Sequence, residues 1–291
     1  MADILVMGGA SYDTIIQLPK NPVTKGTYYA KDAYDRCGST GIAKAVALQK
    51  LGASVTLHTL LGEDLEGQAI TKHLRQCGIH LVTDPDPSGT ELHFNLLDEE
   101  GERITILLPR GRDHRRINEV RLRRLIADAQ LVVLNILEYN QPLIPLLEGK
   151  EVWTDLQDYV EQDPYYTPFI EASQVIFLSS DRLTDYRATM RRLGQGGKLI
   201  VATHGKEGST AFWNHRFYEQ SAHDFHLVDS EGAGDNYFAG FLVEYLKKQN
   251  LERSLMMASV AGGLSIETKE LVPSDLTYDM LVSTMIRKGI R

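Results

Sequence analysis

The sequence predicts a three-layer α/β/α domain with a small β-sheet projecting from one edge. Beyond residue 117, short apolar segments alternate with amphipathic ones, and no flexible linker divides the 291 residues. This alternation is typical of parallel βαβ units with helices on both faces of a sheet. Two β-prone stretches, at about residues 13–36 and 88–109, do not fit that repeat. We expect them to form a projecting sheet, a lid, on a single domain spanning residues 1–291.

The first strand is expected at residues 4–7, followed by two glycines, Gly8 and Gly9. No G-x-G-x-x-G opens a helix there, which argues against a nicotinamide-dependent oxidoreductase. Residues 11–16 look extended instead. Further along, a helix is expected at residues 42–51, closed by Gly52.

The remaining elements follow from apolar runs, helical spacing and turn signals. Strands are expected at residues 55–60, 91–97, 103–108, 131–134, 152–154, 175–178 and 199–202, a small hairpin at 211–218, and helices at 70–77, after Asp235, at 253–266 and at 277–287.

Composition excludes several classes of protein. A net charge of -8 argues against nucleic-acid binding, and two cysteines cannot form a disulfide framework. Neither a signal peptide nor a membrane-length apolar run is found, so a cytoplasmic protein is expected.

The stretch from Asp229 to Asp235 carries the strongest chemical signal. An apolar segment, residues 225–228, runs into a turn containing Gly232 and Gly234, and helical spacing resumes after it. The free N–H groups of a helix N-terminus can hold an anion, and glycines let it approach closely. Asp235 places a carboxylate there that could accept a proton from an attacking hydroxyl. A structural reading, an acid stabilised by the helix dipole, is the alternative.

These residues resemble the signatures of the ribokinase (PfkB-type) carbohydrate kinases. Residues 38–41 (Gly-Ser-Thr-Gly) are similar to the first signature, and residues 229–235 to the second, D-T-x-G-A-G-D. Asp13 stands where that family has its sugar-binding aspartate, and residues 203–208 match its T-x-G-x-x-G nucleotide loop. The order and spacing agree over essentially the whole chain. A Walker A loop does not occur.

The resemblance implies a ribokinase-like fold and phosphoryl transfer from Mg-ATP to a hydroxymethyl group of a sugar, nucleoside or related polyol. Asp235 would be the general base, while Gly232, Ala233 and Gly234 would donate N–H groups to the transferring phosphoryl.

The resemblance also implies binding roles for residues elsewhere in the chain. The substrate set would be Ser11, Asp13, Gly38, Ser39 and Arg112, the nucleotide set Thr203, Gly205, Gly208 and Ser259, and Asp229 would help to hold a monovalent cation such as K⁺.

Three departures from the family pattern bear on the substrate. Ala43 and Ser11 stand where asparagines usually contact the sugar, which puts ribose in doubt. The N-x-x-E motif that orders magnesium-bound water is not preserved at residues 179–182, where Asp181 or Asp185 could substitute or could cap a helix. The acceptor therefore stays open between a nucleoside, a hexose or ketose, and a sugar acid. Arg110 and Arg112 could meet an acidic one.

Two further alternatives remain at the level of sequence. The eroded motifs would also suit a non-catalytic ligand-binding or regulatory protein on the kinase fold. Tyr28, Tyr29 and Tyr34 on the expected lid could stack on a ligand, or could fill a homodimer contact through the lid.

Overall fold

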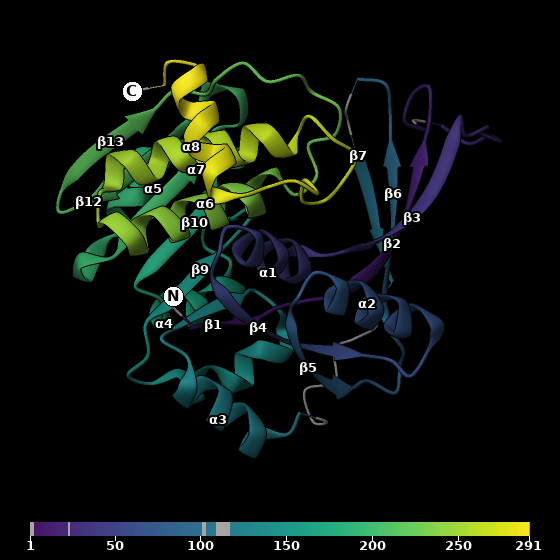
Figure 1. Cartoon of the computed structure of the whole chain (residues 1–291), viewed down its shortest axis with the longest axis horizontal. Helices are drawn as coiled ribbons and strands as arrows, with labels where there is room; N and C mark the ends of the chain where they lie inside the picture. Colours follow the sequence, from purple (N-terminus) through teal and green to yellow (C-terminus); the bar gives the residue numbers. More distant parts are fainter. Residues whose placement is uncertain (1–2, 23, 101–102, 109–116, 291) are drawn as a thin grey trace.

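The computed structural model describes residues 3–22, 24–100, 103–108 and 117–290. Its larger sheet has nine strands in the order β13-β12-β11-β10-β9-β8-β1-β4-β5 (Figure 1). The strands from β11 to β5 are parallel, and the hairpin β12–β13 adds two antiparallel strands at one edge. The bounds of these strands are β1 Asp3–Met7, β4 Ser54–Leu61, β5 His80–Pro85, β8 Leu131–Asn135, β9 Val152–Asp155, β10 Val175–Ser179, β11 Leu199–Thr203, β12 Ser209–Trp213 and β13 Arg216–Gln220.

Helices cover both faces of this sheet, which confirms the three-layer prediction. Successive residues of β1 show why: Ile4 and Val6 enter one apolar cluster, whereas Leu5 and Met7 enter the other. A strand buried on both faces reads as a continuous apolar run. The first cluster involves α1 (Thr40–Lys50), α2 (Leu65–Gln76), α6 (Ala233–Lys248), α7 (Leu251–Ser265) and α8 (Tyr278–Arg287), and the second α3 (Glu119–Asp128), α4 (Thr167–Ala172) and α5 (Tyr186–Leu193).

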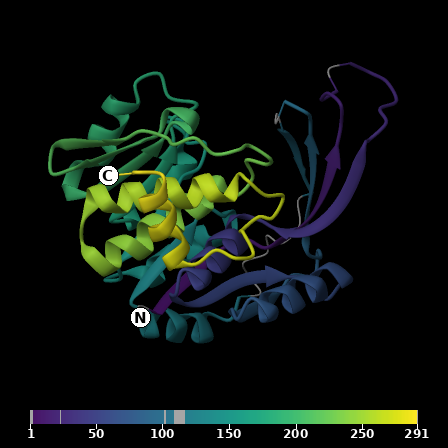
Figure 2. The ribbon, with the colours of Figure 1, turned by 45° about the horizontal axis from the view of Figure 1, so that its top comes forward.

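A separate four-stranded sheet, called the lid from here on, has the order β3-β2-β6-β7. Its strands are β2 Ser11–Gln17, β3 Asp32–Gly38, β6 Glu91–Leu97 and β7 Arg103–Leu107. Figure 2 shows the lid standing away from the helical layers. The chain passes from β1 of the core to β2 of the lid through only Gly8, Gly9 and Ala10.

Strand β5 and the form of the crossover after β8 were not specified by the sequence prediction. Strand β5 was not anticipated, because most of its residues are only partly buried and its apolar pattern is weak. The crossover after β8 is a 3₁₀ segment, Glu138–Leu147, rather than an α-helix, since it contains Pro142 and Pro145.

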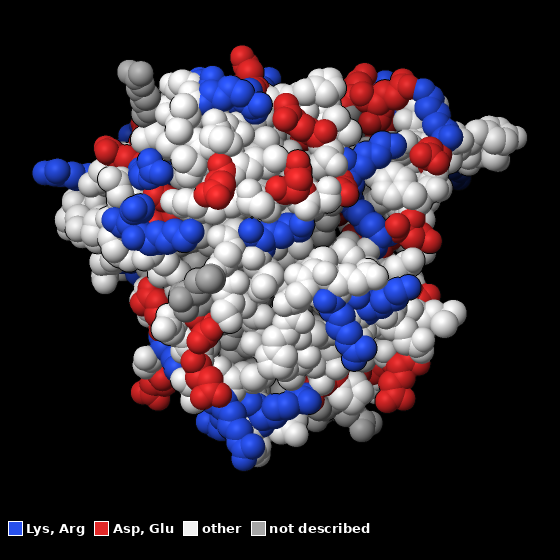
Figure 3. Space-filling model, viewed as in Figure 1, with Lys and Arg blue, Asp and Glu red and all other residues white. Residues whose placement is uncertain are grey.

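Acidic and basic side chains are interspersed over the face shown in Figure 3. Across the described part of the chain, no helix combines the length and apolarity needed to cross a lipid bilayer.

Candidate active site

A cleft of about 670 Å³ opens between the lid and the carboxyl ends of the core strands. In such folds, ligands bind outside the carboxyl ends of the strands. Of the residues predicted from sequence, Ser39, Gly232 and Asp235 line this cleft. Lid residues, among them Glu91, His93 and Asn95, form its other wall.

The glycine turn begins α6 as predicted. Gly232 has φ +78°, and a Cβ there would lie 2.5 Å from the carbonyl oxygen of Leu271, so only glycine suits this turn. The Ala233 N–H makes a long bond, 3.3 Å, to the carbonyl of Ser230. Asp235 lies in the first helical turn and is 8% exposed. Burial raises the pKa of Asp235 to about 6, against the opposing effect of Lys44.

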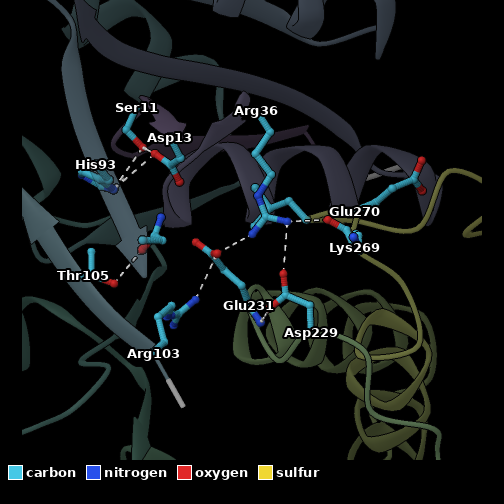
Figure 4. Close-up of polar contacts among 12 residues, drawn as sticks. Ser11, Asp13, Arg36, His93, Arg103, Thr105, Asp229, Glu231, Lys269 and Glu270 are labelled. Carbon is cyan, nitrogen blue, oxygen red and sulfur yellow. Dashed lines mark hydrogen bonds and ion pairs between the residues drawn. The ribbon is translucent and has the colours of Figure 1, made fainter. Parts of the chain in front are cut away.

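Asp13 projects from β2 and is fully buried beside the cleft (Figure 4). Its Oδ1 accepts a hydrogen bond from Ser11 Oγ at 2.6 Å and lies 3.4 Å from His93 Nδ1, while its Oδ2 has no hydrogen-bond partner among the described residues. A Cβ at Gly38 would come within 1.9 Å of this Oδ2. Burial raises the pKa of Asp13 to about 6, against the opposing effects of His93 and Ser11. This orphaned oxygen can accept a ligand hydroxyl.

Strand β6 contributes a polar row that sequence reasoning missed. Glu91, His93 and Asn95 alternate along the strand and all line the cleft. His93 lies between Asp13 and Glu91; burial lowers its pKa, but the two carboxylates outweigh burial and raise it. Asn95 Oδ1 accepts from Thr105 Oγ1 at 2.7 Å, and its Nδ2 finds no partner in the described chain. The alternation of polar residues in a β-prone segment was the signal available.

Ion pairs join the lid to the turn before α6 (Figure 4). Glu231 accepts from Arg36 of β3 and lies 3.1 Å from Arg103 of β7. Arg36 also donates to the carbonyl of Lys269 and lies 3.5 Å from Asp229 Oδ2. The Oδ1 of Asp229 accepts from the Glu231 N–H at 2.9 Å. The lid and the glycine turn are thereby held together.

The expected nucleotide loop lies at the carboxyl end of β11 and does not line the cleft. Gly205 and Gly208 have φ +54° and +111°. The backbone conformation alone therefore accounts for a glycine at each position. His204 spans the loop's base, with Nδ1 2.8 Å from Ser180 Oγ and Nε2 2.9 Å from Thr210 Oγ1. Burial lowers the pKa of His204, which favours the neutral ring. Thr203 ends β11, and Ser259 is half-buried on α7, which packs on β12 and β13.

The other residues named in the sequence analysis lie at the following positions in the fold. Ser39 precedes α1 with φ +79°, a conformation that strains any residue except glycine. Ala43 is fully buried in α1. Asp185 caps α5 by accepting from the Ala188 N–H at 2.9 Å, the capping role suggested from sequence. Arg110 and Arg112 lie outside the described residues.

Along most of its length, the chain is similar to known proteins. The model of the family described as "pfkB family carbohydrate kinase" matches residues 1–163 and 169–277. An acarbose 7(IV)-phosphotransferase of Actinoplanes sp. is 31% identical over 270 residues, which is 89% of this chain and 90% of that protein.

Solved structures show the same fold. A microbiome-derived acarbose kinase, Mak1, superimposes with a TM-score of 0.88 at 24% identity, over 99% of this chain and 100% of the other. The ribokinase of Arabidopsis thaliana, complexed with ribose and ATP, gives a TM-score of 0.79 at 19% identity, over 97% and 98%.

Proposed function

Because the chain belongs to the pfkB family of carbohydrate kinases and is an ATP-dependent phosphotransferase with an alcohol acceptor, we propose that Asp235 is its general base. The observation that carries this proposal is the position of Asp235, in the first turn of α6 and at the wall of the cleft. The N–H groups of Gly232, Ala233 and Gly234 would stabilise the transferring phosphoryl.

Asp13 would position the acceptor in this reaction. Its unpaired Oδ2 would accept a hydrogen bond from an acceptor hydroxyl beside Gly38, with Ser11, Ser39 and the polar row of β6 around it. Asp235 would take the proton of the attacking hydroxyl, whose oxygen bonds to the γ-phosphorus as the bond to ADP breaks. Thr203, Gly205, Gly208 and Ser259 are the proposed nucleotide contacts.

The cleft favours an uncharged polyhydroxy acceptor. Among the described residues that line it, most ionisable side chains are acidic, and the basic ones are already beside carboxylates: Arg103 beside Glu231, and His93 beside Glu91 and Asp13. An anionic acceptor would meet repulsion there. We therefore propose a neutral sugar, carba-sugar or nucleoside, and the relative that phosphorylates acarbose places that compound in the test set.

The test measures ADP release from Mg-ATP with ribose, hexoses, ketoses, nucleosides, acarbose, a sugar acid and a sugar phosphate. Turnover is expected with at least one neutral compound and with neither anion. Calorimetric binding of a compound without any ADP release would instead favour the non-catalytic alternative.

Magnesium fits this arrangement as a companion of ATP. No group of three or more His, Cys, Asp or Glu side chains in the described chain could hold a metal ion. Mg²⁺ in kinases needs few protein carboxylates, because phosphate oxygens and water fill most of its coordination sphere. Asp158, at the wall of the cleft, is the proposed carboxylate. The ion, when bound, would neutralise charge on the phosphates.

Potassium does not fit at Asp229. The Arg36 guanidinium already lies 3.5 Å from this carboxylate, and it also donates a hydrogen bond to the carbonyl of Lys269. A second cation there would meet a positive charge. We expect turnover in potassium chloride to agree within about two-fold with turnover in sodium or N-methylglucamine chloride at equal ionic strength. A larger activation specific to potassium would restore the expectation of a cation at Asp229.

A homodimer through the lid is the proposed assembly. Strand β7 is an edge strand, and its Ile104 and Ile106 are 40% and 50% exposed. An exposed apolar edge strand is suited to pairing with another chain. Light scattering is expected to give twice the chain mass for the wild type and the monomer mass for Ile106→Lys. A monomeric wild type would contradict the proposal.

A further inference from the structure

Lys44 is a charged side chain in an otherwise apolar part of α1. Residues 41–48 of this helix are all buried, and Lys44 is 1% exposed. Removing an ammonium group from water costs several kcal/mol unless carboxylates compensate it. The partners of Lys44 therefore decide what the residue does.

Two carboxylates from different elements meet the Lys44 ammonium. It donates to Asp235 Oδ1 at the start of α6 and lies 2.9 Å from Asp155 Oδ2 at the end of β9. Its Nζ is also 5.2 Å from the centre of the Phe238 ring, one helical turn after Asp235. Asp155 is itself oriented, since its Oδ1 accepts from the Gln157 N–H at 2.9 Å. Three elements thus fix the Asp235 carboxylate.

Asp235 is surrounded by charged groups of both signs. Asp155 from β9 and Glu231 from the preceding turn disfavour a second negative charge, whereas Lys44 from α1 favours it. Glu231 is partly neutralised by Arg36 and Arg103 of the lid. Among the residues that the structure describes, Lys44 is the positive group in direct contact with Asp235. Burial alone would lower the pKa of Lys44, but the two carboxylates raise it above its usual range, so Lys44 stays charged.

We propose that Lys44 is a positioning residue for phosphoryl transfer, which holds the Asp235 carboxylate in place and ionised, while Asp155 keeps Lys44 paired when Asp235 becomes protonated. The acceptor O–H proton goes to Asp235, the hydroxyl electrons form the new O–P bond, and the bond from the γ-phosphorus to ADP breaks. Asp235 then releases its proton to water. The triad changes from net -1 to neutral in this step, and the Lys44–Asp155 ion pair survives it. This inference rests on the proposed role of Asp235.

The Lys44→Met variant tests the proposal through its pH profile. Loss of an adjacent cation is expected to move the acidic limb of kcat/KM upward by about 1 to 3 pH units. Turnover at pH 7 should fall by about two- to 90-fold and recover in part toward pH 9, with the KM for ATP within about two-fold of the wild type. An acidic limb at the same pH as in the wild type would overturn the proposal.

Three further variants serve as controls. Lys150→Met removes a lysine that donates to the carbonyls of Ala127 and Ala129, and its profile should match the wild type. Asp155→Asn removes a like charge near Asp235, so its limb should stay in place or move down. If Lys44→Met does not fold, the double variant Lys44→Met/Asp155→Asn leaves fewer unpaired charges, and its acidic limb should lie above that of Asp155→Asn alone.

A second readout does not depend on turnover. The Asp235 carboxyl carbon, followed by ¹³C NMR in wild type and in Lys44→Met, should titrate at a higher pH in the variant. If the wild type phosphorylates no acceptor, this titration still tests the Lys44 effect, so failure of the inference and failure of the proposed function can be told apart. Equal titration midpoints would contradict the inference alone.

Discussion

Asp235→Asn is expected to lower kcat by about 10²- to 10⁴-fold, the usual contribution of a general base. Asparagine keeps the shape of the side chain and an oxygen that can accept from Lys44, so binding of ATP and acceptor should change little. The loss would therefore be confined to the chemical step. Steady-state ADP release together with calorimetric affinities for both substrates separates these effects.

A matched control replaces another carboxylate of the same cleft. Glu138→Gln also removes one negative charge from the wall, but Glu138 begins the 3₁₀ segment after β8 rather than α6. Its kcat should remain well above that of Asp235→Asn. Turnover of Asp235→Asn close to that of the wild type would remove Asp235 from the mechanism.

Asp13→Asn is expected to raise the KM for the acceptor by about 10- to 150-fold, because a hydrogen bond to a charged group contributes about 1.5–3 kcal/mol. The amide has one acceptor oxygen where the carboxylate has two. Its NH₂ group, a donor, would face either the Ser11 hydroxyl or the substrate. The KM for ATP should stay within about two-fold. Kinetics with each substrate varied in turn provide the measurement.

Asp35→Asn is the control on the same sheet. Asp35 lies on β3 of the lid and accepts from Thr14 in an exposed pair, away from the Asp13 carboxylate. Its acceptor KM should match the wild type. An unchanged KM in Asp13→Asn itself would mean that the acceptor binds elsewhere in the cleft.

The parts predictable from sequence are those set by neighbouring residues. The alternation of strands and helices, the hairpin β12–β13 and the glycine turn before Asp235 all depend on local spacing and backbone preference. The lid was predictable because its segments break the βαβ repeat. Strand β5 was missed for the opposite reason, since a partly buried edge strand has little apolar pattern.

The contacts that complete the candidate site join distant segments. Glu231 and Arg36 are 195 residues apart, and Lys44 and Asp235 are 191 apart. His93 reaches Asp13 because β6 pairs with β2 in one parallel register, which opposes these two residues. A single sequence contains no direct measure of such a register. A lysine within an apolar helix face was nevertheless a visible sign that Lys44 needed a buried partner.

The three-residue connection from β1 to β2 has a consequence for how hydrolysis of ATP by water is limited. Asp13 belongs to the lid, so whatever movement the lid makes carries with it the carboxylate proposed to select the acceptor. Acceptor binding and closure of the site would then occur together. An acceptor that hydrogen-bonds to Asp13 would also bring the lid over the phosphates of ATP. A water molecule is too small to contact both Asp13 and the glycine turn, so it would not close the site. Hydrolysis of ATP in the absence of an acceptor would therefore stay slow.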